Sequence, residues 1–379
     1  MNVQLGVQPA QVSGPIPDAA GLVETVRQMA QKDLAPLVHD IDLKGHYPED
    51  FMRALGQAGA YSAHAPMVDG GGIDIGTSVR AMSEVSEHCL STAFCVWCQD
   101  ALAWYIANSD NSTLKTTIGP KLLTGEALGG TGLSNPMKTL FGIERLKLKA
   151  ERVPGGFSVT GMLPWVSNLG EDHYFGIVFS LPGEDGKMVM AVADCSNENT
   201  KIVANDEFVA LDGTRTFAIQ FRQAFIPDEH VLADPISDYI PRIRAGFILL
   251  QAGMAFGLIR NCIELMEQAG ANLSHVNCHL PDQPDDFRET LAKMEDEVYS
   301  LCATPYDPSP EFFKRVIEAR LAAGDASVAA AHNAMLHCGA RGYVKRGAAQ
   351  RRLREAYFVA IVTPATKQLR KMLADFEAA

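Results

Sequence analysis

The sequence predicts an α+β protein built from three consecutive parts, and two changes in hydrophobic periodicity mark their limits. Apolar residues recur at the helical spacing of three and four at first, which predicts an N-terminal helical domain over residues 1–125. Short strand-like runs then predict a central β-domain over residues 126–236. The helical period returns afterwards and predicts a C-terminal four-helix bundle over residues 237–379.

The first part is a series of predicted helices. The segment "AAGLVETVRQMAQKDLAPLVHDI" places six apolar residues on one helical face: Leu22, Val26, Met29, Ala30, Leu34 and Leu37. The segments "PEDFMRALGQAGA" and "GTSVRAMSEVSEHCLSTAFCVWCQDALAWYIAN" continue this pattern. Between them, the glycines and aspartates of "APMVDGGGIDIG" (residues 65–76) predict a loop.

The second and third parts differ in the length and spacing of their apolar runs. The central part contains short β-rich runs bounded by Gly, Pro, Asn or Asp, namely "RLKLKAERV", "GFSVTG", "YFGIVFSL", "MVMAVAD" and "TFAIQFRQAFI". The last part contains four long helical patterns, which begin at "ISDYIPRIRAGF", "DFRETLAKM", "PEFFKRVIEAR" and "QRRLREAYF". Four long helices of this kind predict a bundle.

Composition limits the partners that the chain is expected to have. With 33 basic and 45 acidic residues, the formal net charge of -12 repels phosphate backbones and anionic membrane surfaces, so we expect no nucleic acid partner. The N-terminal stretch has no basic region followed by an apolar core, and the longest apolar run, "AGFILLQAGMAFGLI", is too short to span a bilayer. We therefore predict a soluble, cytoplasmic protein without a membrane anchor.

The eight cysteines are scattered through apolar segments, which is typical of buried thiols in a reducing compartment. Cys95 and Cys98 form a CxxC pair, but no second pair follows at the spacing of a zinc site. His275, Cys278 and His279 lie in a polar loop without a fourth partner. We predict no metal site from either group.

Several segments, in the same order along the chain, resemble the acyl-CoA dehydrogenase superfamily. The run "VRQMAQKDLAPLVHDIDLKGHYPEDFMRALGQAGAYSAHAP" is similar to the family's N-terminal helices, and "GGTGLSNP" takes the place of its Thr-Glu-Pro strand. The segments "GGFSVTGMLPWVSN" and "LDGTRTFAIQFRQAFIPDEHVL" resemble family β-strands, and "GARGYVKRGAAQRRLREAYF" resembles the final helix pair. The resemblance implies the acyl-CoA dehydrogenase fold, with an antiparallel β-barrel-like centre, and a homodimer or homotetramer that pairs through the bundle.

The resemblance also implies a flavin site in the central domain. In the family, the positions that match Thr131, Leu133, Ser134, Trp165 and Ser167 surround the isoalloxazine ring. A flavin ring needs flat apolar contacts and hydrogen-bond partners, which the indole and the hydroxyl groups can supply. Taken alone, the tryptophan would be an ordinary half-buried strand residue and the serines turn residues, so the prediction depends on the surrounding segments.

The part of the site that holds the rest of FAD departs from the family pattern. Many members bind the adenosine diphosphate with an Arg-x-x-Phe-Gly segment and a Gln from a neighbouring subunit. Here "SHVNCHLPDQPDD" has neither feature, and Leu336 stands near the expected Gln. Arg341, Lys345 and Arg346 are alternative partners for the pyrophosphate, although a solvated basic helix end explains them as well. FMN is the alternative cofactor.

The residue that removes the substrate's α-proton in the family is replaced in this chain. Dehydrogenation of an acyl thioester needs such a base, usually a carboxylate. The Glu of the commonest branch falls at Thr363 in "AIVTPATKQL", and the Glu of a second branch falls near Phe247. Neither side chain is basic at neutral pH. The usual mechanism would therefore lose the contribution of general-base catalysis to the reaction rate, which is roughly 10²- to 10⁴-fold.

Three functions are compatible with this pattern. The first is a flavin-dependent oxygenase (monooxygenase) of the flavin-peroxide type, which the absence of a base at both positions favours. It would act on an acyl- or aryl-CoA thioester or a related small molecule. A flavin reductase would be its partner. Relatives that hydroxylate other substrates have lost the same Glu. The second is an acyl-CoA dehydrogenase with a relocated base, for which Glu87, His88 and Glu126 are candidates, each also explained as a solvated helix residue. The third is a non-catalytic binding descendant.

Overall fold

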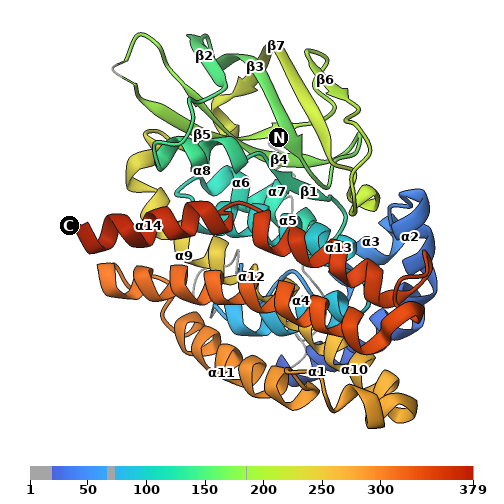
Figure 1. Cartoon of the computed structure of the whole chain (residues 1–379). Coiled ribbons are helices and arrows are strands. Elements are labelled where there is room, and N and C mark those ends of the chain that lie inside the picture. Colours follow the sequence, from blue (N-terminus) through green and yellow to red (C-terminus); the bar gives the residue numbers. More distant parts are fainter. Residues whose placement is uncertain (1–18, 66–72, 185, 379) are drawn as a thin grey trace.

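The computed structural model describes residues 19–65, 73–184 and 186–378 and arranges them as a β-sheet layer above a body of helices (Figure 1). Seven residues of the Gly- and Asp-rich segment predicted as a loop, 66–72, lie outside the described residues. Residues 1–18, which make up most of the N-terminal stretch considered for a targeting signal, also lie outside the described residues. The order of helices, sheet and helices confirms the predicted fold class.

Among the described residues, seven α-helices form the N-terminal part. They are α1 (Ala19–Met29), α2 (Val38–Lys44), α3 (Glu49–Gln57), α4 (Ile75–His88), α5 (Leu90–Asn108), α6 (Ser112–Thr116) and α7 (Ile118–Thr124). Four residues of the predicted apolar face, Leu22, Val26, Ala30 and Leu34, are buried, and the other two pack against the same core. The first predicted helix is interrupted by a π-helical turn and a 3-10 turn between α1 and α2, because Pro36 lacks the amide hydrogen that would continue the helix.

The central part is one eight-stranded sheet with an inserted helix. Its elements are β1 (Gly129–Thr131), α8 (Ser134–Leu140), β2 (Leu148–Val153), β3 (Gly156–Val166), β4 (Tyr174–Ser180), β5 (Met188–Asp194), β6 (Thr200–Val203), β7 (Phe217–Pro227) and β8 (Val231–Ala233). The strand order is β6-β7-β3-β2-β4-β5-β8, with β1 beside β4. Most ladders are antiparallel, and the structure adds two parallel pairs, β1 with β4 and β2 with β4.

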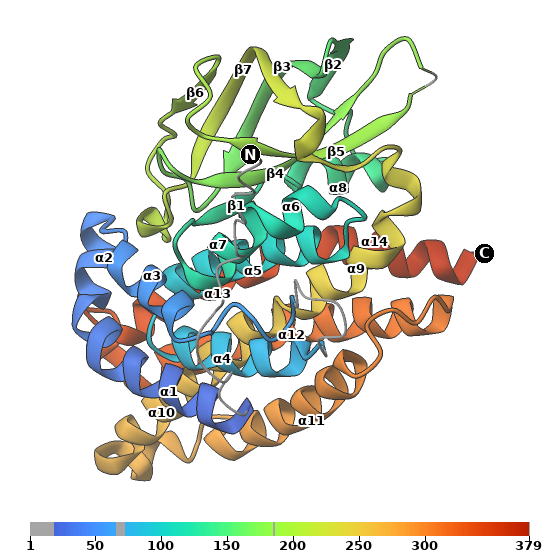
Figure 2. The same cartoon turned by 180° about the vertical axis from the view of Figure 1, so that it is seen from behind.

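The C-terminal part contains the four predicted helical stretches, two of which are broken. Its helices are α9 (Ile240–Leu249), α10 (Ala252–Asn277), α11 (Pro284–Cys302), α12 (Pro310–Cys338), α13 (Ala348–Ile361) and α14 (Thr366–Ala378). The break between α13 and α14 is at Pro364, because the residue before a proline is disfavoured in the helical conformation. Figure 2 shows the protein from behind, where α13 and α14 lie on the far side of the helices below the sheet and are partly hidden.

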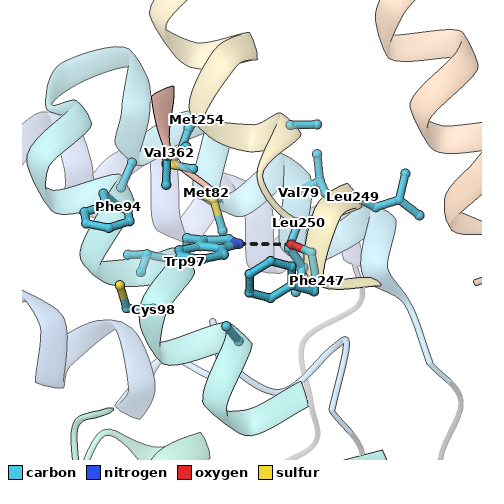
Figure 3. Packing of buried hydrophobic residues seen from close by; sticks show 14 of the residues in the cluster. Val79, Met82, Phe94, Trp97, Cys98, Phe247, Leu249, Leu250, Met254 and Val362 are labelled. Atoms are coloured by element: carbon cyan, nitrogen blue, oxygen red, sulfur yellow. Dashed lines mark hydrogen bonds between the residues drawn. The ribbon is translucent and has the colours of Figure 1, made fainter. Parts of the chain in front are cut away.

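The helices before and after the sheet share one apolar core, whereas the sheet has a core of its own. Helix α10 lies against α4 at Gly257, where a Cβ atom would come within 2.1 Å of the Ser83 carbonyl oxygen. Figure 3 shows part of this shared core, in which the Trp97 indole N–H donates to the Phe247 carbonyl at 3.3 Å. The stretch Ile240–Asn277 is long and apolar enough to cross a membrane by composition, but 89% of its apolar window is buried inside the protein, as in a core helix.

Candidate functional site

A cavity of about 790 Å³ opens between the sheet and the helices. Its walls come from α5, the segment from β1 into α8, the end of β3, the loop between β6 and β7, α9, and the segment from the end of α13 into α14. The residues of the sequence prediction that line it are Thr131, Ser134, Trp165, Ser167, Phe247 and Thr363. The volume lies within the roughly 300–1,000 Å³ that is typical of small-molecule and cofactor sites.

Close backbone contacts bring the hydroxyl residues of this wall together. A Cβ atom at Gly130 would come within 2.1 Å of the Ser167 carbonyl oxygen, so only glycine lets β1 lie this close to the segment after β3. Thr131, the next residue, is thereby placed on the same wall as Ser167. Helix α8 then begins at Ser134, directly after the turn that ends β1.

Hydroxyl groups form short chains along the cavity. Ser134 Oγ lies 3.0 Å from Thr363 Oγ1, and Thr131 Oγ1 lies 2.9 Å from the Tyr105 hydroxyl. Ser167 Oγ lies 2.6 Å from Thr216 Oγ1. A hydroxyl can both donate and accept, so these groups can serve the carbonyl and N–H edge of a flavin ring, which presents both kinds of partner.

Aromatic side chains supply the flat apolar surfaces that such a ring needs. The register between β3 and β7 shifts between Leu163 and Val166, and bulges of this kind re-aim side chains next to binding sites. Trp165 lies in this irregularity and is 49% exposed, which leaves about half of its surface free for a ligand. Trp97 and Phe247 pack with ring centroids 5.0 Å apart on the opposite, helical side. The residues present therefore fit a flavin ring.

Two of the predicted cofactor residues do not line the cavity. Leu133 is buried in the turn before α8 but is absent from the cavity wall. Arg341 is exposed in the 3-10 turn after α12 (Gly339–Arg341), and Lys345 and Arg346 are exposed nearby, so none of the three reaches the cavity within this chain. That Arg341 binds the pyrophosphate of the cofactor stays a prediction, since Arg341 does not line the cavity of the single chain.

The cavity instead carries cations that the sequence analysis did not single out. Lys138 on α8 and Lys367 and Arg370 on α14 all line it. Arg370 pairs with Asp325 at 3.0 Å and Lys138 lies 3.6 Å from Glu144. Lys138 is far from Lys367 and Arg370 in the sequence. The three cations line the same cavity only because the fold brings α8 and α14 to it.

Both positions of the family base face the cavity, and both are neutral. Thr363 and Phe247 belong to the wall, and among the described residues that line the cavity there is no carboxylate. The candidates for a relocated base lie elsewhere: Glu87 is 3.5 Å from Arg260, and the exposed Glu126 is 3.7 Å from Lys121. His88, at the end of α4, does not line the cavity either.

One carboxylate, which the sequence analysis did not consider, lies beside the cavity. Glu144 lines a small niche of about 110 Å³ that shares Ser134 and Trp165 with the cavity. Partial burial raises the pKa of Glu144, but a hydrogen bond from Asn135 at 3.0 Å and the charge of Lys138 outweigh it and lower the pKa overall. Glu144 is therefore ionised at neutral pH and is a weaker base than an isolated carboxylate.

None of the described cysteines lines the cavity, although Cys95 Sγ lies 3.8 Å from the carbonyl oxygen of Thr214 in its wall. Cys95 and Cys98 are both buried on α5, and burial raises the pKa of each thiol. In the described part of the chain, no group of three or more His, Cys, Asp or Glu residues is arranged to hold a metal ion.

Comparisons with known proteins agree with this architecture. The family profile "Acyl-CoA dehydrogenase, N-terminal domain" matches residues 17–126. Mitochondrial isovaleryl-CoA dehydrogenase of Oryza sativa subsp. japonica is 23% identical over 368 residues, which cover 92% of this chain and 88% of that protein.

Solved structures extend the similarity to the whole fold. Butyryl-CoA dehydrogenase from Megasphaera elsdenii matches with a TM-score of 0.84 at 16% identity, covering 97% of this chain and 99% of that chain. A structure described as an FAD-dependent dehydrogenase matches with a TM-score of 0.76 at 16% identity, covering 96% and 98% of the two chains.

Proposed function

We propose that this chain, which belongs to the acyl-CoA dehydrogenase superfamily, is a flavin-dependent oxidoreductase that acts on an acyl thioester or a related small molecule. One observation carries the proposal: four of the five predicted ring-binding residues, Thr131, Ser134, Trp165 and Ser167, come from separate segments and line one cavity of about 790 Å³.

FAD is the cofactor that we propose, and the name of the similar FAD-dependent dehydrogenase supports it. When bound, the flavin supplies a ring that can accept or donate a hydride. Trp165 would lie against the ring, and the hydroxyl groups of Ser134, Ser167 and Thr131 would hold its polar edge. FMN remains the alternative, because Arg341 is not at the cavity and this chain lacks the family's usual partners for the adenosine diphosphate.

Dehydrogenation of an acyl thioester is the finer function that the relatives' names support. It requires a group that removes the α-proton, and no described residue of the cavity wall is a carboxylate. Glu144, in the niche next to Ser134 and Trp165, is the nearest candidate by its surroundings. Because its pKa is lowered, Glu144 is ionised at neutral pH and can accept a proton. The driving force for this proton transfer is small, since a carboxylate with a lowered pKa is a weak base.

An oxygenase is the second candidate, and a specific observation favours it. Thr363 and Phe247 both face the cavity, so the two positions that carry a base in the family are occupied by side chains that cannot accept a proton. Thr363 is moreover engaged with Ser134. An oxygenase needs a dry pocket and no α-proton base, and it would depend on a flavin reductase for reduced flavin.

One experiment separates these functions. The purified protein, loaded with FAD, is mixed anaerobically with butyryl-CoA while the flavin absorbance is followed. If the protein is a dehydrogenase, the substrate reduces the flavin and the absorbance falls. In a second arm, enzymatically reduced flavin and the same thioester are supplied in air; an oxygenase consumes dioxygen in a substrate-dependent manner. A protein that binds flavin but does neither is a binding descendant, and one that binds no flavin contradicts the proposal.

We also propose that the chain forms a homodimer or homotetramer. Val276, Leu336, Tyr343 and Val344 are exposed apolar residues at the ends of α10 and α12 and in the loop that follows. These two helix ends are joined by a hydrogen bond from Asn277 to the His337 carbonyl at 3.2 Å. A second copy of the chain would cover this surface. Light scattering after size-exclusion chromatography measures the oligomeric state.

A further inference from the structure

We propose that Lys138, Lys367 and Arg370 together bind the phosphate groups of the flavin nucleotide, as a cationic subsite that α8 and α14 contribute to the cavity. The inference rests on the proposed function, since it assigns part of the same cavity. Arg341 does not line the cavity, and the chain lacks the family's usual partners for the adenosine diphosphate. Other cations of the chain are therefore needed to hold the phosphates.

The three cations follow in the chain from the contact between Ser134 and Thr363. The two hydroxyl oxygens lie 3.0 Å apart. Lys138 comes four residues after Ser134 on α8, so the two side chains share one face of that helix. Lys367 and Arg370 come after Thr363 and are three residues apart on α14, so they also share a face. All five residues line the same cavity.

Lys138 lies beside residues that we assign to the flavin ring. It lines the cavity together with Ser134 and Trp165, and it lines the niche of about 110 Å³ with the same two residues. In FMN and FAD, only a short ribityl chain separates the ring from the first phosphate. A ring bound at Trp165 and Ser134 therefore requires its phosphate groups to be held close to these residues.

The charge of the cavity wall favours an anion. The chain carries a net charge of -12, yet no described residue of the wall is a carboxylate. Among the described residues, no ion pair or hydrogen bond engages the Lys367 ammonium group. Arg370 pairs with Asp325 at 3.0 Å, and the Lys138 ammonium group lies 3.6 Å from Glu144.

These two ion pairs do not exhaust the donors of Arg370 and Lys138. A guanidinium group has five N–H donors and an ammonium group has three, so each side chain can also donate to a phosphate oxygen. Charge-assisted hydrogen bonds of this kind are among the strongest that proteins form with phosphate. The cluster is therefore suited to a ligand that carries several anionic oxygens.

Equilibrium binding of FAD and of riboflavin to the flavin-free, full-length protein tests the subsite, because riboflavin has the same ring and ribityl chain but no phosphate. Flavin fluorescence measures both affinities. We expect the wild type to bind FAD more tightly than riboflavin. Each of Lys138→Gln, Lys367→Gln and Arg370→Gln is expected to weaken FAD binding by about ten-fold and to leave riboflavin binding unchanged.

The control variant is Lys371→Gln. Lys371 is also on α14, but it pairs with Asp375 at 2.6 Å and does not line the cavity, so both affinities should stay the same. Equal wild-type affinities for FAD and riboflavin, unchanged FAD affinity in the three variants, or equal losses for the two flavins overturn the subsite while the proposed function stands.

The phosphates of a CoA thioester are a second source of the same chemistry, so the affinity of the FAD-loaded protein for acetyl-CoA is measured alongside. If the three variants lose affinity for acetyl-CoA but not for FAD, the cations hold the substrate and the proposal is wrong. A wild type that binds neither flavin contradicts the proposed function, and the subsite is then wrong with it.

Discussion

Ser134 Oγ and Thr363 Oγ1 lie 3.0 Å apart, although 229 residues separate them in the sequence. The contact joins the start of α8, beneath the sheet, to the break between α13 and α14. It places a neutral hydroxyl at the position where the family's commonest base would stand, within the cavity that we assign to flavin and substrate.

Thr363→Glu tests whether the cavity lacks only a base. A carboxylate at this position is expected to raise the rate of anaerobic flavin reduction by butyryl-CoA by at least about 10²-fold over the wild type, since general-base catalysis typically contributes 10²- to 10⁴-fold. Stopped-flow absorbance measures the rate. Thr363→Gln, of the same shape but not basic, is the control. A wild type that is already as fast as the Glu variant would show that another base operates.

Glu144→Gln tests the carboxylate in the neighbouring niche. If Glu144 removes the α-proton, the same reduction rate falls by about 10²-fold or more, because the amide cannot accept a proton. Acetyl-CoA affinity is expected to stay the same. The exposed Glu151 on β2 provides the control variant Glu151→Gln. An unchanged rate in Glu144→Gln excludes it as the base.

Removing the Trp165 indole and the Ser134 hydroxyl together should cause loss of the bound flavin. The double variant Trp165→Ala, Ser134→Ala is expected to lose most of its bound FAD, because it removes the half-exposed indole and a polar partner from the same wall. The absorbance of released flavin relative to protein measures the occupancy. Phe225→Ala on β7, another exposed aromatic of the sheet, should retain full flavin content. Wild-type occupancy in the double variant would place the ring elsewhere.

His64 makes stability depend on pH. Burial lowers its pKa from 6.5 to about 4, so the folded protein holds a neutral ring while the unfolded chain binds a proton below pH 6.5. Its contribution is fully present above pH 6.5 and is lost as pH falls toward 4. Between pH 7 and pH 5, the free energy of unfolding of the wild type should fall by about 2 kcal/mol more than that of His64→Gln.

Urea denaturation at several pH values measures this difference. The comparison with the variant is needed because the neighbouring Asp100 contributes with the opposite sign: burial raises its pKa, and it is present in both proteins. Identical pH profiles for the wild type and His64→Gln would contradict the assignment.

Gly257 tests the contact between the helices before and after the sheet. A Cβ atom there would meet the Ser83 carbonyl oxygen at 2.1 Å, so Gly257→Ala must push α10 away from α4 and should destabilise the fold by about 1–3 kcal/mol or more. Gly270, on the same helix, has nothing within 4 Å of its Cβ position. Gly270→Ala should be neutral or stabilising by up to about 1 kcal/mol. Thermal unfolding of both variants provides the comparison, and equal effects would contradict close packing at Gly257.

Local patterns were enough to predict most of the helices and the longer strands. The buried face of α1, with Leu22 and Val26, follows from spacing alone, because residues three and four apart meet on one side of a helix. Periodicity did not single out the short strands β1, β6 and β8, since three or four residues carry too little of it, and only the resemblance indicated strands at β1 and near β8. The resemblance to known segments added Thr131, Ser134, Trp165 and Ser167, which the structure brings to one cavity.

The sequence by itself determined which segments become helices and strands, and which residue types stand at the positions of a flavin site and its missing base. Only the tertiary structure decided that Arg341 lies away from the cavity and that Lys138, Lys367 and Arg370 gather at it. The physical reason is range: secondary structure depends on neighbours within a few residues, whereas these contacts join segments that are far apart in the chain and meet only when the shared core forms.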